Sequence, residues 1–132
     1  MNTDGLAAEA RRAALRSYSP YSRFRVGAVV VDSEGRRHTG ANVENAAYGS
    51  SICAEATAIS GAVARGVRRI EGVAVACVDA DGVDNAYPCG NCRQLMNEFG
   101  VEWVVGGAGG GSEVPRPPPS GLPPQGHLKK CT

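Results

Sequence analysis

The fold is decided by two short segments that carry metal-binding chemistry, Cys53-Ala54-Glu55 and Pro88-Cys89-Gly90-Asn91-Cys92. Thiolates bind zinc readily, and a catalytic zinc has three protein ligands with a water in the fourth position. We therefore expect Cys53, Cys89 and Cys92 to hold one Zn²⁺. Glu55 lies close enough in sequence to carry protons for the water and should not be a ligand, since a fourth protein ligand would displace that water.

Two predicted helix starts bring these ligands together. Cys53 lies at or near the first turn of a helix over about 52–65, and Cys92 lies in the first turn of another over about 90–99. The positive end of a helix dipole lowers the pKa of a thiol and favours the thiolate. Positions two apart on a regular helix do not face each other. Cys53 and Glu55 can therefore share a site only if the metal lies over the end of the helix.

The bulk composition describes one globular domain without a nucleic-acid or membrane signature. The chain has 132 residues, 42% hydrophobic and 20% charged, with a formal net charge of +1. A nucleic-acid surface needs a denser basic patch than its small groups of arginines provide. The first ten residues lack a signal-peptide pattern, and no apolar run is long enough to span a membrane. These features point to the cytoplasm, where thiols stay reduced. Among the five cysteines, the Cys-x-x-Cys pair then indicates metal binding or redox chemistry rather than a structural disulfide.

Periodicity predicts alternating helices and strands, which is typical of a layered α/β domain. The helices are expected at about 3–17, 52–65 and 90–99, with Ser50 or Ser51 capping the second. The strands are expected at about 24–31, 36–43, 72–78 and 101–105. We assign residues 1–105 to the domain and 106–132 to a Gly/Pro-rich C-terminal segment. That segment has room for a short edge strand near Glu113-Val114, followed by a tail.

The alternative is a closed zinc site that only stabilises the fold. Such a site needs a fourth ligand, and the remaining candidates are Cys77, Cys131, His38 and His127. We interpret Cys77 as a buried apolar residue within a strand and His38 as a surface residue of a hairpin. The other two lie near the C-terminus, so we favour a catalytic zinc.

The sequence resembles the cytidine deaminase family, of the small homotetrameric type whose zinc is held by three cysteines. The resemblance covers about residues 5–105. It rests on five motifs, Tyr18-Ser-Pro-Tyr-Ser-Arg-Phe24, Val26-Gly-Ala28, Gly40-Ala-Asn-Val-Glu-Asn-Ala-Ala-Tyr-Gly49, Cys53-Ala-Glu55 and Pro88-Cys-Gly-Asn-Cys-Arg-Gln94. It implies a three-layer α/β/α sandwich around a mixed five-stranded sheet, and one Zn²⁺ per subunit.

The resemblance also implies roles for the residues around the metal. Phe24 would line the nucleoside pocket, and Asn42 and Glu44 would hydrogen-bond the ribose hydroxyls. Ala54 would offer its backbone N–H to the base carbonyl. Tyr48 would lie at a subunit boundary near a neighbour's site, because such sites are shared between the subunits of a homotetramer.

Three departures from the family pattern bear on rate and substrate. Ala56 stands where many members have an arginine that hydrogen-bonds the thiolates, and Tyr87 replaces the usual serine before Pro88. The C-terminal segment 106–132 lacks the phenylalanine that usually closes over a neighbouring site. Three thiolates leave a zinc site with a net charge of −1, so loss of the arginine weakens the metal as a Lewis acid.

The expected activity is hydrolytic deamination of cytidine and deoxycytidine to uridine and deoxyuridine, with release of ammonia, in cytoplasmic pyrimidine salvage. Two alternatives remain open at the level of sequence. The first is deamination of a modified aminopyrimidine nucleoside such as blasticidin S, whose deaminases also resemble the motif without the arginine. The second is an inactive, zinc-stabilised domain that acts by binding.

Overall fold

The computed structural model describes residues 5–79, 90–108 and 113–116. Three α-helices, one 3₁₀ helix (η1) and five strands follow one another along the chain. Their order is α1 (Leu6–Ala14), β1 (Val26–Asp32), β2 (Arg37–Ala41), η1 (Tyr48–Ser50), α2 (Ala54–Ala64), β3 (Ile70–Cys77), α3 (Gly90–Glu98), β4 (Trp103–Ala108) and β5 (Glu113–Arg116).

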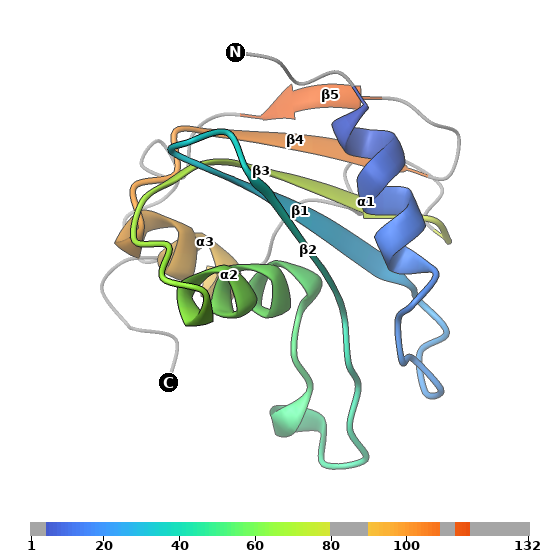
Figure 1. Ribbon diagram of the computed structural model, residues 1–132. Helices are drawn as coiled ribbons and strands as arrows, with labels where there is room; N and C mark the ends of the chain where they lie inside the picture. Colours follow the sequence, from blue (N-terminus) through green and yellow to red (C-terminus); the bar gives the residue numbers. More distant parts are fainter. Residues whose placement is uncertain (1–4, 80–89, 109–112, 117–132) are drawn as a thin grey trace.

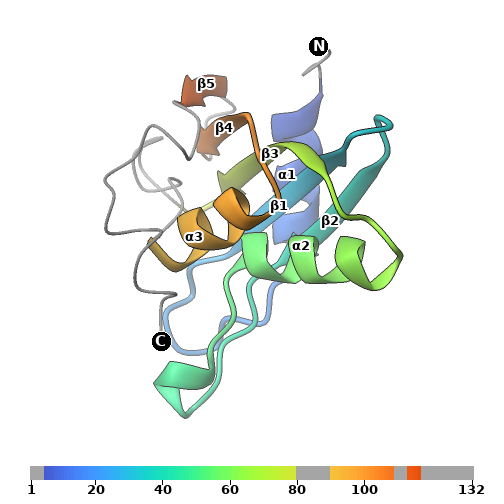
Figure 2. The same cartoon turned by 90° about the vertical axis from the view of Figure 1, so that its left-hand side faces the viewer.

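The strands form one mixed sheet in the order β2-β1-β3-β4-β5. Strands β3 and β4 pair in parallel, and the remaining neighbours pair antiparallel. Helix α1 covers one face, whereas α2 and α3 cover the other (Figure 1, Figure 2). The predicted α/β class with helices on both faces is therefore confirmed, and β5 is an edge strand at the predicted position.

Each face of the sheet has its own hydrophobic core because successive strand residues point to opposite sides. In β1, Ala28 and Val30 pack with α2 and α3, while Val29 and Val31 pack with α1. The helix stripe over α2 is built from small residues, including Ala54, Ala58 and Ala62. Small side chains let the helices lie close to the sheet.

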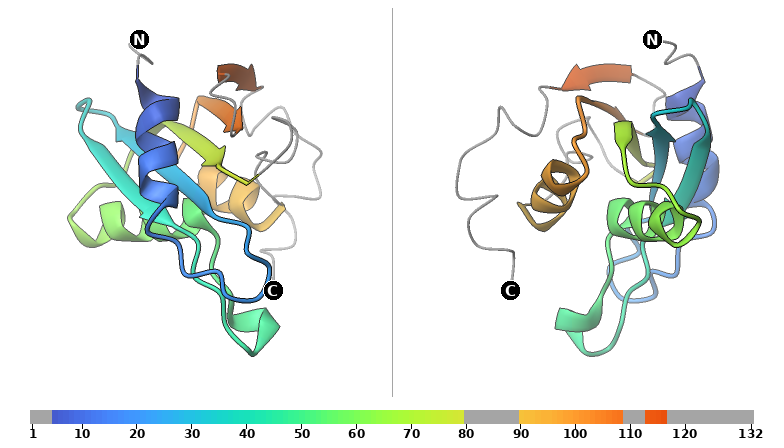
Figure 3. Two further views of the ribbon diagram at one scale, coloured as in Figure 1. Left: turned by 90° about the vertical axis from the view of Figure 1, so that its right-hand side faces the viewer. Right: turned by 60° about the vertical axis from the view of Figure 1, so that its left-hand side comes forward.

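Two glycines set how closely the helices approach. A Cβ at Gly27 would lie 2.0 Å from the carbonyl oxygen of Ala10 in α1, and a Cβ at Gly40 would lie 2.5 Å from the backbone nitrogen of Ala58 in α2. Both contacts are with backbone, which cannot turn aside as a flexible side chain can. Helix α1 runs in front of β1 and β2 in the left panel of Figure 3.

Several element boundaries differ from the predicted ones. Helix α1 is shorter, since Leu15, Arg16 and Ser17 each donate to the carbonyl three residues earlier and tighten the chain into a turn. Helix α2 starts at Ala54 with Cys53 as its N-cap, so the predicted capping by Ser50 or Ser51 is wrong. The predicted N-terminal residues Thr3 and Asp4 lie outside the described residues.

We predict that Gly40→Ala destabilises the protein by about 3 kcal/mol, since an added methyl group must push α2 away from β2. Thermal or denaturant unfolding measures the change. The matched control is Gly61→Ala. Gly61 lies in α2, and only the flexible Arg65 side chain is near its added Cβ. This exchange should stabilise the protein by about 0.5–1 kcal/mol through helix propensity. Equal stability of Gly40→Ala and wild type would show that this contact does not set the helix position.

Candidate metal and nucleoside site

A pocket of about 410 Å³ lies where β1 begins and β2 ends. The register pairs Val26 with Cys77 and Gly27 with Ala41, so the start of β1 and the ends of β2 and β3 meet at one end of the sheet. The pocket volume is typical of sites for small organic molecules. The start of α2 and the segment that precedes β1 complete its lining.

Irregular backbone pairing shapes this pocket. Val43 exchanges two hydrogen bonds with Ile52, at 2.9 and 2.8 Å, and its two neighbours pair with Tyr18 on the other side. The backbone carbonyl of Asn42 accepts from the Tyr18 N–H at 3.0 Å, and the Glu44 N–H donates to the Tyr18 carbonyl at 2.8 Å. Residues 18, 43 and 52, hereafter the three-segment clasp, hold the entry to α2 beside the segment that precedes β1.

Three predicted site residues come together, and two of them, Cys53 and Glu55, line the pocket. One ligand atom each from Cys53, Glu55 and Cys92 lies within 4.8 Å of the other two. Cys92 and Glu55 are buried, and Cys53 is half-buried. Two sulfurs at this spacing suit a thiophilic cation such as Zn²⁺. The predicted third ligand, Cys89, lies outside the described residues, as do Tyr87 and Pro88.

The backbone at Cys53 explains how it shares a site with Glu55. Cys53 has φ −72° and ψ 155°, an extended conformation, and α2 begins only at the next residue. Its side chain is therefore free of the helical periodicity that would turn it away from Glu55. Glu55 is 5% exposed and lies in the first turn of α2. This arrangement brings ligand atoms of Cys53 and Glu55 within 4.8 Å of each other at the start of α2, although the two residues are only two apart.

Asn42 lines the pocket, but most of its hydrogen-bonding capacity is used within the protein. Its Oδ1 accepts from the Ser17 hydroxyl at 2.5 Å and from the Val26 N–H at 3.0 Å. Its Nδ2 donates to the Phe24 carbonyl at 2.9 Å. An amide oxygen has two lone pairs and the NH₂ group has two donors. Among the described residues, one N–H of Asn42 is left for a ligand.

Glu44 also lines the pocket, and its carboxylate binds the segment that precedes β1. Oε1 accepts from the N–H groups of Tyr21 at 3.0 Å and Ser22 at 3.1 Å, and Oε2 accepts from the Ser22 hydroxyl. The hydroxyl of Ser22 is the largest cause that lowers the pKa of Glu44, and the two backbone N–H groups act in the same direction. Glu44 is therefore a carboxylate with one acceptor position on Oε2 still available.

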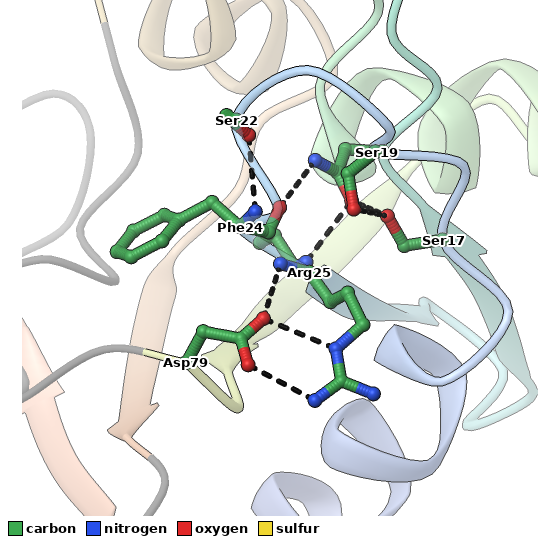
Figure 4. A network of polar contacts seen from close by, with 8 residues as sticks. Ser17, Ser19, Ser22, Phe24, Arg25 and Asp79 are labelled. Carbon is green, nitrogen blue, oxygen red and sulfur yellow. Dashed lines mark hydrogen bonds and ion pairs between the residues drawn. The ribbon is translucent and has the colours of Figure 1, made fainter.

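The other predicted substrate residues differ in where they lie. Ala54 lines the pocket at the first position of α2, where backbone N–H groups have no intrahelical acceptor. Tyr48 also lines the pocket, from η1, and is 90% exposed. Phe24 is 37% exposed and is not among the described residues that line the pocket. Its ring extends away from the neighbouring ion pair in Figure 4, and its role stays a prediction.

Sequence reasoning missed the polar residues that support this site. Ser17 and Ser22 carry hydroxyls that bind Asn42 and Glu44. Arg25 forms a bidentate ion pair with Asp79, from Nε to Oδ2 at 3.1 Å and from Nη2 to Oδ1 at 2.9 Å (Figure 4). These contacts hold the pKa of Asp79 below its ordinary value. Ser22 belongs to the Tyr18–Phe24 motif that the sequence analysis singled out, but no spacing rule predicts which serine of a motif binds a distant carboxylate.

The candidates for a fourth, structural ligand have other roles or lie outside the described residues. His38 is 8% exposed rather than a surface residue, so that prediction is wrong. Its Nε2 lies 3.1 Å from the buried Asp32 carboxylate, and its Nδ1 lies 3.3 Å from Arg65. Cys77 is buried in β3 as expected. Cys131 and His127 lie outside the described residues.

Within the part of the chain that the structure describes, no helix is both long and apolar enough to cross a membrane.

The fold and the paired sulfurs beside a buried carboxylate define a metal-dependent α/β protein with a small-molecule pocket. Residues 2–108 match the family model for the cytidine and deoxycytidylate deaminase zinc-binding region. The chain therefore belongs to the cytidine and deoxycytidylate deaminase family, and Zn²⁺ is its metal.

The similarity of this chain to individual proteins supports the family assignment. The chain is 42% identical to a cytidine deaminase of Sporosarcina psychrophila over 99 residues, which cover 75% of this chain and 71% of the relative. It is 44% identical to a cytidine deaminase of Mycobacterium tuberculosis over 95 residues, 72% and 69% of the two chains. The crystal structure of a cytidine deaminase from Burkholderia pseudomallei superimposes with a TM-score of 0.84 at 38% identity, covering 94% of this chain and 98% of the other.

We predict that Cys92→Ala reduces bound zinc well below one ion per chain, whereas Glu55→Ala retains it. A sulfur ligand contributes directly to binding, while the carboxylate contributes only charge beside the metal. Inductively coupled plasma mass spectrometry of the purified variants measures the stoichiometry. Cys77→Ala is the control, since its sulfur belongs to β3 and should not affect zinc content. Loss of zinc from Glu55→Ala would make Glu55 a ligand and contradict its assignment.

Proposed function

We propose that this chain catalyses zinc-dependent hydrolytic deamination of cytidine and deoxycytidine to uridine and deoxyuridine, with release of ammonia. The observation that carries the proposal is the convergence of Cys53, Glu55 and Cys92 within 4.8 Å, with Cys53 and Glu55 lining a pocket that Asn42 and Glu44 also line. The first three supply hydrolytic chemistry, and the other two supply polar groups suited to a sugar. The reaction would serve pyrimidine salvage.

The residues present fit one Zn²⁺ per subunit, held by Cys53, Cys89 and Cys92. The described donors are sulfurs at the N-terminal ends of α2 and α3, where the helix dipole favours thiolates. When bound, zinc lowers the pKa of a water from about 15.7 toward about 7 and makes it nucleophilic at neutral pH. Thiolate chemistry of this kind requires reduced cysteines, which supports a cytoplasmic location.

Glu55 is the proton carrier of the reaction. Buried beside the sulfurs, its carboxylate would accept a proton from the attacking water and deliver it to a ring nitrogen of the base. It would then help to protonate the amine that leaves as ammonia. Each transfer requires the carboxylate to remain unligated, which agrees with three sulfurs as the metal ligands.

Asn42 and Glu44 offer complementary groups to a sugar hydroxyl. One N–H of the Asn42 amide and one acceptor position on Oε2 of Glu44 remain after their internal hydrogen bonds. A hydroxyl both accepts and donates, so a single ribose hydroxyl could satisfy both. Phe24 and Tyr48 would contact the nucleoside, and the backbone N–H of Ala54 would bind the base carbonyl.

The chain would act as a homotetramer with active sites shared between subunits. The segment between β2 and α2 extends away from the sheet (Figure 1) and carries exposed large side chains at Val43, Tyr48 and Ile52. Contiguous apolar side chains of this kind are typical of contact surfaces. Tyr48 belongs to η1, is 90% exposed and also lines the pocket, which supports its placement at a subunit boundary.

Two alternatives are less favoured. The relatives reported above carry the name cytidine deaminase, which favours cytidine over a modified nucleoside such as blasticidin S. A buried carboxylate beside the sulfurs is unnecessary in a purely structural zinc site, which disfavours an inactive binding domain.

We predict that the zinc-loaded protein converts cytidine and deoxycytidine, with loss of cytidine absorbance and equimolar ammonia. Glu55→Gln should keep its zinc and lose about 10²–10⁴-fold in kcat, as expected for removal of a general acid–base. The substrate panel should also contain cytosine, deoxycytidylate and blasticidin S. Turnover of blasticidin S without turnover of cytidine would replace the proposed substrate, and no turnover of any compound by zinc-loaded wild type would favour a binding domain.

We also predict that Tyr48→Ala weakens subunit association and lowers activity at low protein concentration. The variant removes a large exposed ring from η1, so the free energy of unfolding of a single subunit should change little. Light scattering with size-exclusion chromatography measures the mass, and activity is followed on dilution. The control is Leu15→Ala, which removes an exposed apolar side chain after α1. A wild-type protein that remains monomeric at all concentrations would contradict the tetramer.

A further inference from the structure

The hydroxyl of Ser22 connects two residues assigned to the nucleoside. It donates to Oε2 of Glu44. It also accepts from the backbone N–H of Phe24 at 3.0 Å (Figure 4). The backbone N–H of the same serine donates to Oε1 of Glu44 at 3.1 Å. Ser22 therefore holds both oxygens of the carboxylate and, through its oxygen, the backbone of Phe24.

The backbone around Ser22 is strained and requires such support. The next residue, Arg23, has φ 61° and is the only described non-glycine residue with positive φ. A non-glycine residue in this region costs about 1 kcal/mol or more. Its N–H donates to the Ser19 carbonyl at 3.0 Å, and the Glu44 carboxylate binds the two residues just before it. Strain that neighbouring contacts maintain is typical of functional segments.

Geometry also limits the freedom of the carboxylate. Glu44 follows β2 by three residues and lies outside the helices and strands. The orientation of its side chain therefore depends on the hydrogen bonds of the carboxylate itself. Its three hydrogen bonds to Tyr21 and Ser22 orient it, and within the described part of the chain only the Ser22 hydroxyl bonds to Oε2. Oε2 is the oxygen with an acceptor position left for a ligand. The serine hydroxyl thus determines the direction in which that position is presented.

We propose that Ser22 is a positioning residue for sugar recognition, which orients the Glu44 carboxylate and couples it to the Phe24 backbone. This inference rests on the proposed nucleoside deaminase function. The hydroxyl of Ser22 donates its proton to Oε2 of Glu44, so the serine acts through that carboxylate. Its removal should therefore weaken binding of the sugar in ground and transition states alike, with little effect on the chemical step.

The kinetic test compares Ser22→Ala, Ser22→Thr and wild type on cytidine and deoxycytidine. Ser22→Ala should raise KM and the inhibition constant of uridine by about three- to tenfold, as for loss of a hydrogen bond to a charged group, with kcat within about twofold. Ser22→Thr retains a hydroxyl and should restore most of the affinity. Ser33→Ala, an exposed serine in the β1–β2 turn, is the control and should match wild type.

A second readout does not depend on turnover. The carboxyl carbon of Glu44, followed by NMR during a pH titration, should show a higher pKa in Ser22→Ala than in wild type, because the hydroxyl that stabilises the charged form is gone. The other titratable groups that line the pocket are Tyr21, Tyr48, Cys53 and Glu55, and they are the same in both proteins. Ser33→Ala should leave the Glu44 titration unchanged.

The outcomes separate the inference from the function on which it rests. An unchanged KM and an unchanged Glu44 titration in a folded Ser22→Ala variant would overturn the positioning role, with the deaminase function intact. A fall in kcat at constant KM would instead place Ser22 in the chemical step and also overturn it. Failure of zinc-loaded wild type to deaminate any nucleoside would overturn the proposed function, and the sugar role with it, even if the titration shows that Ser22 holds Glu44.

Discussion

The close contact between Gly40 of β2 and the backbone of α2 is the constraint on which the rest of the site depends. With no side chain at Gly40, the first turns of α2 lie directly on the sheet, and the carbonyl of Ala54 lies 2.9 Å from where a Cβ would be. This contact sets the depth at which Cys53 and Glu55 enter the pocket. A displaced helix would separate these two residues from Cys92, which belongs to a different helix.

The clasp between residues 18, 43 and 52 determines the direction from which the chain enters α2. Because Ile52 pairs with Val43, the backbone is extended up to Cys53 and turns helical only at Ala54. An extended N-cap lets a sulfur point over the helix end, where the unpaired N–H groups of the first turn lie. The helix start therefore contributes to the site in two ways: it positions the sulfur and favours its charged form.

The local chemistry of the site could be predicted from the sequence better than its supporting contacts could. Cys53, Glu55 and Cys92 were expected at one site, because thiols and a carboxylate at the starts of two helices are typical of a zinc site. The burial of His38 was not expected, because it depends on a hydrogen bond with Asp32 across the hairpin and on Arg65 from α2. Such contacts join residues from separate elements, and neither periodicity nor composition records them.

The part of the pocket formed by Asn42 and Glu44 also depends on contacts that the sequence did not predict. The predicted strand over about 36–43 includes Asn42 and ends next to Glu44, yet β2 ends at Ala41 and both residues lie in irregular backbone. They share the pocket because their side chains bind the backbone of the segment before β1, at Tyr21, Ser22, Phe24 and Val26. The same amide and carboxylate thus bind the protein backbone and line the pocket. A substitution at either position would alter both, so loss of activity alone cannot reveal its role. The hydroxyl of Ser22 donates to this carboxylate and accepts from the Phe24 N–H, so its removal changes the orientation of Glu44 while the carboxylate itself stays in place.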